Sequence, residues 1–193
     1  MGETTETKPP APDDAAATSA RTGAPRPWVK AGRLTGGRAV GCLTVLAGVV
    51  ILLTLADMDA RVSLLVGLAA FLPLPLYVAL ALWLDRYEPE PRRMLITAFL
   101  WGASVAVLAA GLVNGLADSA FGEAVGTVIT GPIAEEVIKA FILFRFYVKR
   151  PDEFDGVIDG LIYAAMVGLG FAAVENLEYY GRSFAKEGAS GLA

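Results

Sequence analysis

The sequence predicts an all-α fold, a polytopic transmembrane helical bundle of about five spans whose N-terminus is cytoplasmic. Two observations point to this fold class. The 193 residues are 55% hydrophobic and 19% charged, whereas a soluble domain is typically about 45–50% apolar and about 25% charged. The apolar residues also fall into runs of roughly 20, the length that crosses a bilayer as a helix. Charged segments separate these runs.

Residues 1–37 are expected to form a disordered cytoplasmic tail. This segment is rich in Ala, Thr, Pro and Gly, and such a composition buries too little apolar surface to offset the entropy of ordering. No signal peptide is recognisable, because the first long apolar run begins only near Ala39. A transmembrane domain is predicted over 38–181. Residues 182–193 are expected to be a short tail at which a longer protein has been truncated, so that the chain is an N-terminal fragment.

Five membrane spans are predicted, and the second and fourth contain prolines. Pro73 and Pro75 should kink the second span, which membrane helices tolerate where neighbours satisfy the released carbonyls. After the third span, the segment N-G-L-A-D-S-A-F-G-E at 114–123 is predicted to be a loop. The spans are placed near 39–56, 62–84, 94–113, 123–147 and 157–180.

The positive charges predict the orientation of the spans. Cytoplasmic loops carry an excess of Lys and Arg, and in this chain basic and non-basic connections alternate. The N-terminus is therefore placed inside and the tail after the fifth span outside, although Arg182 and Lys186 weaken the last assignment. The basic groups are Arg21, Arg26, Lys30, Arg33 and Arg38, then Arg86, Arg92 and Arg93, then Arg145, Lys149 and Arg150.

Three charged side chains, Glu135, Glu136 and Lys139, lie within the otherwise apolar fourth span. A charge at the bilayer centre costs about 2.5–3.5 kcal/mol on insertion scales, and two adjacent ionised carboxylates repel each other. Lys139 follows the two acids by four and three residues, so it can pair with either. The group is therefore either an ion pair facing the bundle interior or a functional site, which is the usual meaning of ionisable residues inside a membrane.

The dipeptide Gly131-Pro132 precedes these acids and disturbs the helix next to them. Proline lacks an N–H, so the carbonyl of Val128 loses its helical partner. Either the helix bends there, or a new helix begins with Thr130 near its cap position. Unpaired backbone groups at membrane depth occur only inside protein or beside a watery cavity. The sequence thus predicts a water-accessible polar pocket near the acids, with a simple packing kink as the alternative.

The fifth span carries Phe171 and Glu175 on one helix face, with Asn176 beside them. Small residues that recur every four positions on this span allow another helix to approach closely. Glu175 lies near this row of small residues, so it is expected at a contact with the fourth span. Three converging carboxylates would require protons or a metal ion, and carboxylate-rich sites in bundles commonly hold metals. The small residues recur every four positions, at Gly156, Gly160, Ala164, Gly168 and Ala172.

Two further acidic segments have simpler explanations. Asp155 and Asp159 precede or open the fifth span, where the helix dipole favours a carboxylate. The segment D-R-Y-E-P-E-P-R-R at 85–93 is expected to be an ordinary solvated turn in which Arg86 or Glu88 could lock neighbouring loops.

Four motifs together resemble the PrsW family of intramembrane metalloproteases, which is distantly similar to the CAAX prenyl protease-like membrane proteins. The resemblance covers about residues 70–180. It implies a metal-dependent endopeptidase that cleaves membrane-anchored proteins, such as an anti-sigma-type factor, in the bacterial cytoplasmic membrane. The motifs are D-R-Y-E-P-E-P (85–91), E-E-V-I-K (135–139), D-G-V-I-D-G (155–160) and F-A-A-V-E-N (171–176).

The resemblance also implies roles for individual residues. Glu135, Glu136 and Glu175 would be catalytic acids, with Glu135 as general base and with Glu136 and Glu175 as metal ligands. Lys139, Phe171 and Asn176 would support them. The implied cofactor is a divalent metal, expected to be zinc. The family normally supplies histidine, and this chain has none. Catalytic zinc usually has a nitrogen or sulfur ligand, whereas carboxylates alone suit harder ions such as Mg or Mn.

Two other functions remain as alternatives, and one class is excluded. The same scaffold could serve as a catalytically inactive interaction protein that binds single-span partners. Paired intramembrane acids also occur in ion or proton transporters, although this sequence shows no inverted repeat. Basic patches interleaved with aromatic residues are absent from the sequence, so nucleic-acid binding has no support.

Overall fold

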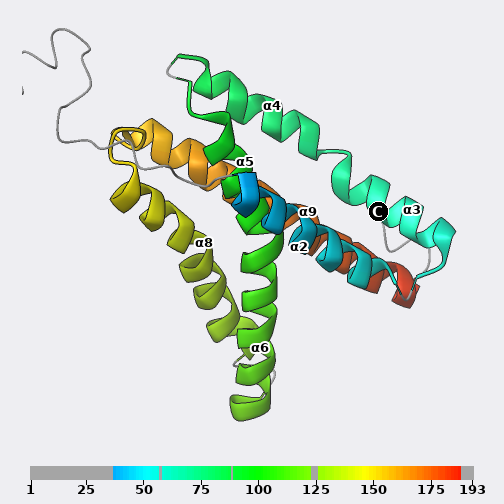
Figure 1. Ribbon diagram of the computed structural model, residues 1–193. Coiled ribbons are helices and arrows are strands. Elements are labelled where there is room, and N and C mark those ends of the chain that lie inside the picture. The colour runs from blue at the N-terminus through cyan, green and yellow to red at the C-terminus, as the bar shows by residue number, and fades with distance from the viewer. Residues whose placement is uncertain (1–36, 57, 88, 123–125, 188–193) are drawn as a thin grey trace, which may run out of the picture. The chain divides into compact units, whose positions relative to one another are not determined.

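The computed structural model describes residues 37–56, 58–87, 89–122 and 126–187, and every regular element within these ranges is helical. Contacts divide the chain into 1–32 and 33–193, and the helices of the described ranges belong to the second unit. The predicted N-terminal tail, apart from Gly37, lies outside the described residues. The all-helical architecture agrees with the predicted fold class (Figure 1).

Four helical segments of the described chain are long and apolar enough to cross a membrane, namely Arg38–Leu55, Ala60–Tyr87, Arg92–Phe121 and Val157–Lys186. The first corresponds to α2 (Gly37–Leu55). The second is interrupted, as its prolines predict. It consists of α3 (Ala60–Phe71) and α4 (Leu74–Leu84), with Pro73 at the cap position of α4, and it ends in the short turn η1 (Asp85–Tyr87).

The third segment is longer than predicted. It contains α5 (Arg92–Trp101), the π-helical turn η2 (Gly102–Ala106) and α6 (Val107–Phe121). The prediction of a loop beginning at Asn114 is therefore wrong: the first helix-ending conformation comes only at Gly122. Its φ of 88° is a conformation that glycine adopts without a Cβ clash. Its N–H donates to the carbonyl of Asp118 at 3.0 Å.

The segment around Pro132 forms a new helix, which is one of the two predicted alternatives. A π-helical turn, η3 (Gly126–Thr130), leads into α8 (Gly131–Lys149), with Thr130 at the cap position and proline in the first turn. α8 is not among the four membrane-capable segments because charged residues are spread along its whole 19-residue length. Its charges are Glu135, Glu136, Lys139, Arg145 and Lys149.

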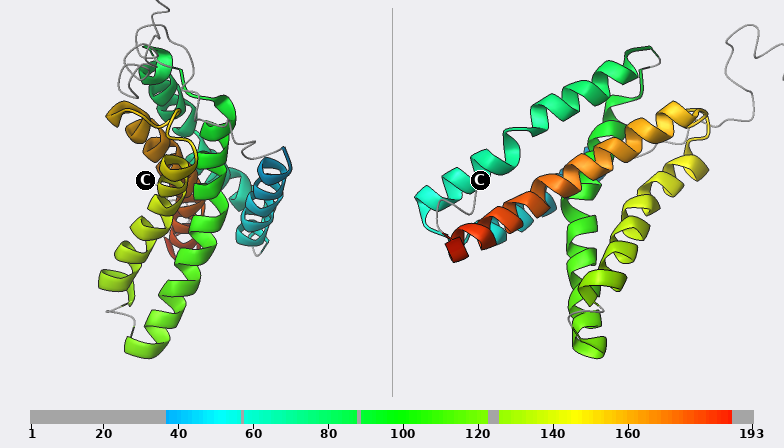
Figure 2. Two further views of the ribbon diagram at one scale, coloured as in Figure 1. Left: turned by 60° about the vertical axis from the view of Figure 1, so that its left-hand side comes forward. Right: turned by 180° about the vertical axis from the view of Figure 1, so that it is seen from behind.

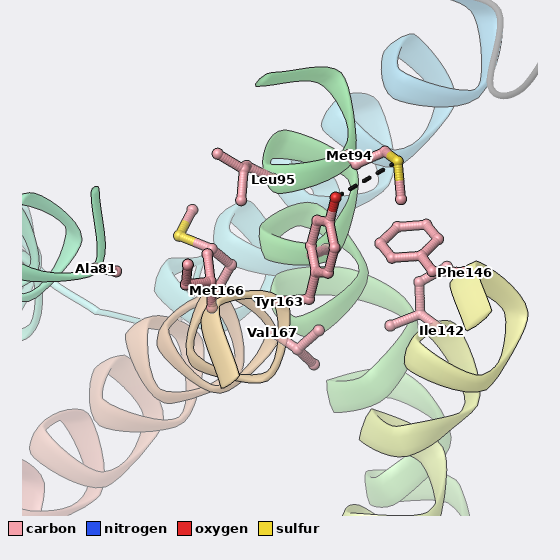
Figure 3. Packing of buried hydrophobic residues seen from close by; sticks show 10 residues of the cluster. Ala81, Met94, Leu95, Ile142, Phe146, Tyr163, Met166 and Val167 are labelled. Carbon is pink, nitrogen blue, oxygen red and sulfur yellow. Dashed lines mark hydrogen bonds between the residues drawn. The ribbon is translucent and has the colours of Figure 1, made fainter. Parts of the chain in front are cut away.

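The last helix, α9 (Val157–Glu187), is the centre of the described bundle. It packs against α2, α3, α4, α5, α6 and α8, and Figure 2 shows it crossing α6. In the most apolar 18-residue stretch of α9, half of the residues are buried, whereas in that of α2 only 11% are buried. In the largest core cluster, Tyr163 of α9 lies between Met94 and Phe146, and its hydroxyl is 3.6 Å from the Met94 sulfur (Figure 3).

Two glycines outside the predicted four-residue repeat lie where α9 and the α5–η2 segment approach each other closely. A Cβ on Gly102 would overlap the carbonyl oxygen of Val167, and a Cβ on Gly170 would overlap that of Phe99. Gly168, which the repeat did include, has nothing within 4 Å of such a Cβ. The expectation for Gly168 is thus wrong, because a four-residue repeat drifts about 40° per step around a helix of 3.6 residues per turn.

The segment 85–91 is not the solvated turn that its charges suggested. Asp85 and Glu90 are buried. The backbone N–H of Glu90 donates to Asp85 Oδ1 at 3.0 Å, and the Tyr163 hydroxyl donates to Glu90 Oε2. Arg86 instead lies on the rings of Trp83 and Tyr87. Glu88 is outside the described residues.

Asp159 has the structural role expected of a carboxylate in a first turn. Its Oδ2 accepts hydrogen bonds from the N–H groups of Asp155 at 3.0 Å and Gly156 at 2.7 Å. The side chain therefore satisfies backbone donors at the start of α9 that have no helical partner.

Candidate active site

A cavity of about 630 Å³ lies between α6, α8 and α9, and the three acids singled out in the sequence line it. Glu135 and Glu136 of α8 and Glu175 of α9 thus border one cavity, but the described residues contain no three acids close enough to share a metal ion. Figure 2 shows α6 and α8 side by side next to the crossing with α9. The remaining lining residues are Gly111, Asn114, Gly115 and Asp118 of α6, Pro132 of α8, and Glu178, Tyr179 and Arg182 of α9.

Lys139 pairs with both acids of α8. Its Nζ is 2.8 Å from Glu136 Oε1 and 3.7 Å from Glu135 Oε2. The Glu135 side chain is 27% exposed and that of Glu136 is 76% exposed. Glu135 is therefore the more enclosed acid, whereas Glu136 extends into the open part of the site. The ion pair that the sequence offered as one alternative is therefore present within α8. The same acids also line a cavity.

Lys139 also joins α8 to α9. Its Nζ lies 4.0 Å from the centroid of the Phe171 ring, and Phe171 is buried. An ammonium group over an aromatic face is attracted by the ring quadrupole. Two of the three residues expected to support the acids are thus in direct contact with each other. Asn176 is not one of the residues that line the cavity.

Trp101 of α5 holds α8 from the other side, and sequence reasoning missed it. Its Nε1–H donates to the backbone carbonyl of Ile138 at 3.1 Å, and its ring stacks on Phe141 with centroids 5.7 Å apart. The available signal was a tryptophan within an apolar run, because a buried indole N–H usually finds an acceptor.

Asn114 and Asp118 of α6 were missed because their segment was expected to be a loop. Both line the cavity. Their Oδ1 atoms are buried and have no hydrogen-bond partner among the described residues. Their spacing of four residues in a stretch without proline was the signal that could have placed them on one helix face.

The cavity is strongly acidic. Five of its described lining side chains are carboxylic acids, and one, Arg182, is a cation. Arg182 forms an ion pair with Glu178, one turn earlier on α9. Both residues, together with Gly111, also border a second and more apolar cavity of about 650 Å³ between α2, α6 and α9. The acidic cavity and this apolar cavity are therefore neighbours that share part of their lining.

The donors at this site do not by themselves fit a zinc ion. Among the described residues, no three His, Cys, Asp or Glu side chains come close enough together to hold a metal. The sequence contains no histidine, and Cys42 is an exposed residue of α2. The arrangement supports proton transfer between a carboxylate and water, with Lys139 and Arg182 as neighbouring positive charges.

Comparison with known proteins gives a consistent assignment. A family model described as PrsW family intramembrane metalloprotease matches residues 90–193. Protease PrsW of Geobacillus kaustophilus is 38% identical over 49% of this chain and 43% of the relative. Protease PrsW of Clostridioides difficile is 38% identical over 49% of the chain and 42% of the relative. The chain therefore spans less than half the length of these curated relatives. No solved structure matches it.

Proposed function

Because the chain belongs to the PrsW family of intramembrane metalloproteases, we propose that its cavity acids serve a metal-dependent endopeptidase of the bacterial cytoplasmic membrane. The four membrane-capable segments and the family make it an integral membrane protein. The observation that carries the proposal is the placement of Glu135, Glu136 and Glu175 around one cavity. The proposed substrates are membrane-anchored proteins cut in regulated proteolysis, such as an anti-sigma-type factor.

Glu135 is the proposed general base. Its side chain is half-enclosed and lines the cavity, so it can contact both water and a peptide bound there. A positioned carboxylate that removes a proton from attacking water typically contributes about 10²–10⁴-fold to the rate. Lys139 offsets the repulsion between the adjacent carboxylates, and Phe171 holds its ammonium group against α9.

Glu136 and Glu175 are proposed as carboxylate ligands of the metal that the family name implies. That metal would supply Lewis-acid chemistry, and the oxygen donors of the described cavity suit a harder ion such as Mg or Mn better than zinc. The acids of the described cavity offer only oxygen donors, so the metal site needs further ligands. Metal content of the purified full-length protein, compared with that of the Glu136→Gln and Glu175→Gln variants, tests this assignment. An unchanged metal content in both variants would contradict it.

The decisive experiment is Glu135→Gln in the full-length protein. Membranes containing wild type or variant are compared by mass spectrometry for new protein N-termini. Loss of the base should reduce cleavage at least about a hundredfold while the variant still inserts. Asp152→Asn serves as the control, because Asp152 is exposed, lies outside the cavity and loses the same charge.

Wild-type cleavage by Glu135→Gln would overturn the proposed role. If wild type and variant release no products and retain the same bound partners, the non-catalytic interaction protein is the better explanation.

A further inference from the structure

We propose that Trp101 is a positioning residue of the candidate active site, whose indole N–H fixes the rotation of α8 and so keeps Glu135 directed into the acidic cavity. Trp101 is not one of the residues that line this cavity, so it acts through α8 and not by touching a substrate. The inference rests on the proposed function and adds the residue that places its general base.

The first observation is the two-part contact between Trp101 and α8. The indole Nε1–H donates to the backbone carbonyl of Ile138 at 3.1 Å, and the ring stacks on Phe141 with an interplanar angle of 19°. A carbonyl oxygen has two lone pairs, so that of Ile138 can accept the indole N–H in addition to a helical N–H. Because a hydrogen bond and a stacked ring both have a preferred geometry, Trp101 restrains the axial position and the rotation of α8.

The second observation is the place of Glu135 relative to this contact. Residues three apart on a helix are separated by about 60° around its axis and by about 4.5 Å along it. Glu135 precedes Ile138 by three residues, and Phe141 follows Ile138 by three. Glu135 therefore lies at the edge of the face that Trp101 holds, on the side away from Phe141. A small rotation of α8 would carry its carboxylate toward or away from the cavity.

The third observation is that the residue after Trp101 fixes the position of α9. A Cβ on Gly102 would overlap the carbonyl oxygen of Val167 and would come within 2.8 Å of the backbone nitrogen of Phe171. Phe171 precedes Glu175, the acid of α9, by four residues. Two consecutive residues of the third membrane-capable segment thus contact both of the helices that carry the cavity acids.

Lys139 closes this arrangement by joining α8 to α9. It directly follows Ile138, the acceptor of the Trp101 N–H, and its Nζ pairs with Glu135 and lies over the Phe171 ring. Trp101 and Ile138 pack against the same core cluster, to which Phe171 belongs. The π-helical turn η2 begins at Gly102, and such turns are frequent at functional sites. The three helical segments therefore meet at one junction beside the acids.

Two magnitudes distinguish a positioning role from a purely structural one. Because a hydrogen bond between membrane helices contributes little to stability, its loss should lower the unfolding temperature by only about 2 °C. A misplacement of about 1 Å at an active site can cost about a hundredfold in rate. A positioning role for Trp101 therefore predicts a large loss of rate at nearly unchanged stability.

The first test removes the N–H and keeps the shape of the ring. 3-Benzothienylalanine, in which sulfur replaces the indole N–H, is incorporated at position 101 of the full-length protein. The release of new protein N-termini in membranes should slow about 10–100-fold, while the unfolding temperature in detergent falls by about 2 °C or less.

Two matched controls accompany this test. 6-Fluorotryptophan at position 101 retains the N–H donor, so the rate should stay within about twofold of wild type. 3-Benzothienylalanine at Trp83, an exposed residue of α4, makes the same chemical change away from the junction and should leave the rate unchanged.

The second test measures the position of α8 and needs no substrate. Spin labels are attached at Val137→Cys on α8 and Leu161→Cys on α9, two exposed positions, in a background without other cysteines. In nanodiscs, 3-benzothienylalanine at position 101 should shift or broaden the distance distribution by about 1–2 Å, the size of a typical helix shift. 6-Fluorotryptophan should leave the distribution unchanged.

The outcomes separate this inference from the proposed function. If wild type cleaves membrane proteins and both analogues at position 101 cleave equally fast, the positioning role is wrong and the protease stands. A collapse of stability with 3-benzothienylalanine would also overturn the proposal, because Trp101 would then be a packing residue. If wild type releases no products, the proposed function falls, and the label distances alone decide whether the indole N–H holds α8 in place.

Discussion

Lys139 shows how a single residue can connect motifs that lie far apart in the sequence. It pairs with Glu135 and Glu136 on its own helix and rests on Phe171 of α9. An exposed pair of this spacing contributes only about 0.3–0.5 kcal/mol. In a low-dielectric bundle the same charges interact more strongly. Lys139 therefore matters chiefly because its positive charge offsets the repulsion between two adjacent carboxylates that line the cavity.

Glu90 is a buried carboxyl outside the membrane-spanning segments. Its pKa is raised from 4.5 to about 7, chiefly by burial. The hydrogen bond from Tyr163 lowers this pKa, and the nearby Asp159 and Asp85 contribute to raising it. A carboxyl whose pKa is higher in the folded protein binds its proton more tightly there. Its contribution to stability is thus complete below pH 4.5 and is lost as the pH rises through about 7.

We expect Glu90→Gln to remove this pH dependence. Relative to the variant, wild type should lose up to roughly 3 kcal/mol of unfolding free energy between pH 4.5 and 7. Thermal unfolding of the full-length protein in detergent, measured across this range, checks the prediction. Parallel pH profiles for wild type and variant would contradict it. Glu153→Gln, in the nearby loop, is the matched control.

At the scale of elements, the contact between α9 and the α5–η2 segment depends on glycine. At Gly102 and Gly170 the backbone of one helix approaches the other so closely that no Cβ fits. The same crossing carries Phe171, and hence the contact with Lys139, into place. Small residues are used in this way because close backbone packing replaces the hydrophobic driving force within lipid.

Gly170→Ala should therefore destabilise the bundle. The added methyl group meets backbone atoms of Phe99, which cannot move aside as a flexible side chain would. Overpacking of this kind typically costs about 1–3 kcal/mol, and thermal unfolding in detergent measures it.

Gly168→Ala is the matched control on the same helix, because the new Cβ meets nothing within 4 Å. It should cause no loss, since alanine favours helix over glycine. Equal destabilisation by the two substitutions would contradict the assigned crossing point.

At the scale of the whole molecule, α8 differs from the other long helices in its relation to the membrane. The alternation of basic loops predicts that it crosses, with the end of α6 outside and the loop after α8 in the cytoplasm. Its own charges make it a poor independent span. Its contacts with α6 and α9, together with the pairing of Lys139, are the features that would retain it in the bundle.

Cysteine labelling in a background without other cysteines tests this orientation. Ser119→Cys, near the end of α6, should react with an impermeant maleimide from outside intact cells. Asp152→Cys, in the loop after α8, should react only after permeabilisation. Both positions are exposed. Labelling of both from the same side would show that α8 does not cross. Cys42→Ser supplies the background for the described chain.

The sequence by itself determined the fold class, the break at Pro73, the new helix at Pro132 and the acids of α8 and α9. These features depend on local hydropathy, on proline geometry and on charges within apolar runs. The sequence was less informative about Asn114 and Asp118, because a short polar segment after 20 apolar residues looks like a loop.

Only the tertiary structure decided which residues meet. Gathering Glu135, Glu136 and Glu175 around one cavity, together with Asn114 and Asp118 of α6, requires the relative rotation of three helices that are distant in sequence. The relative rotation of the helices also decides that Gly170, and not Gly168, faces the backbone of Phe99. The burial of Glu90 against Tyr163 depends on packing across 73 residues of chain. Such contacts depend on how whole helices pack, and this cannot be read from the local pattern of residues.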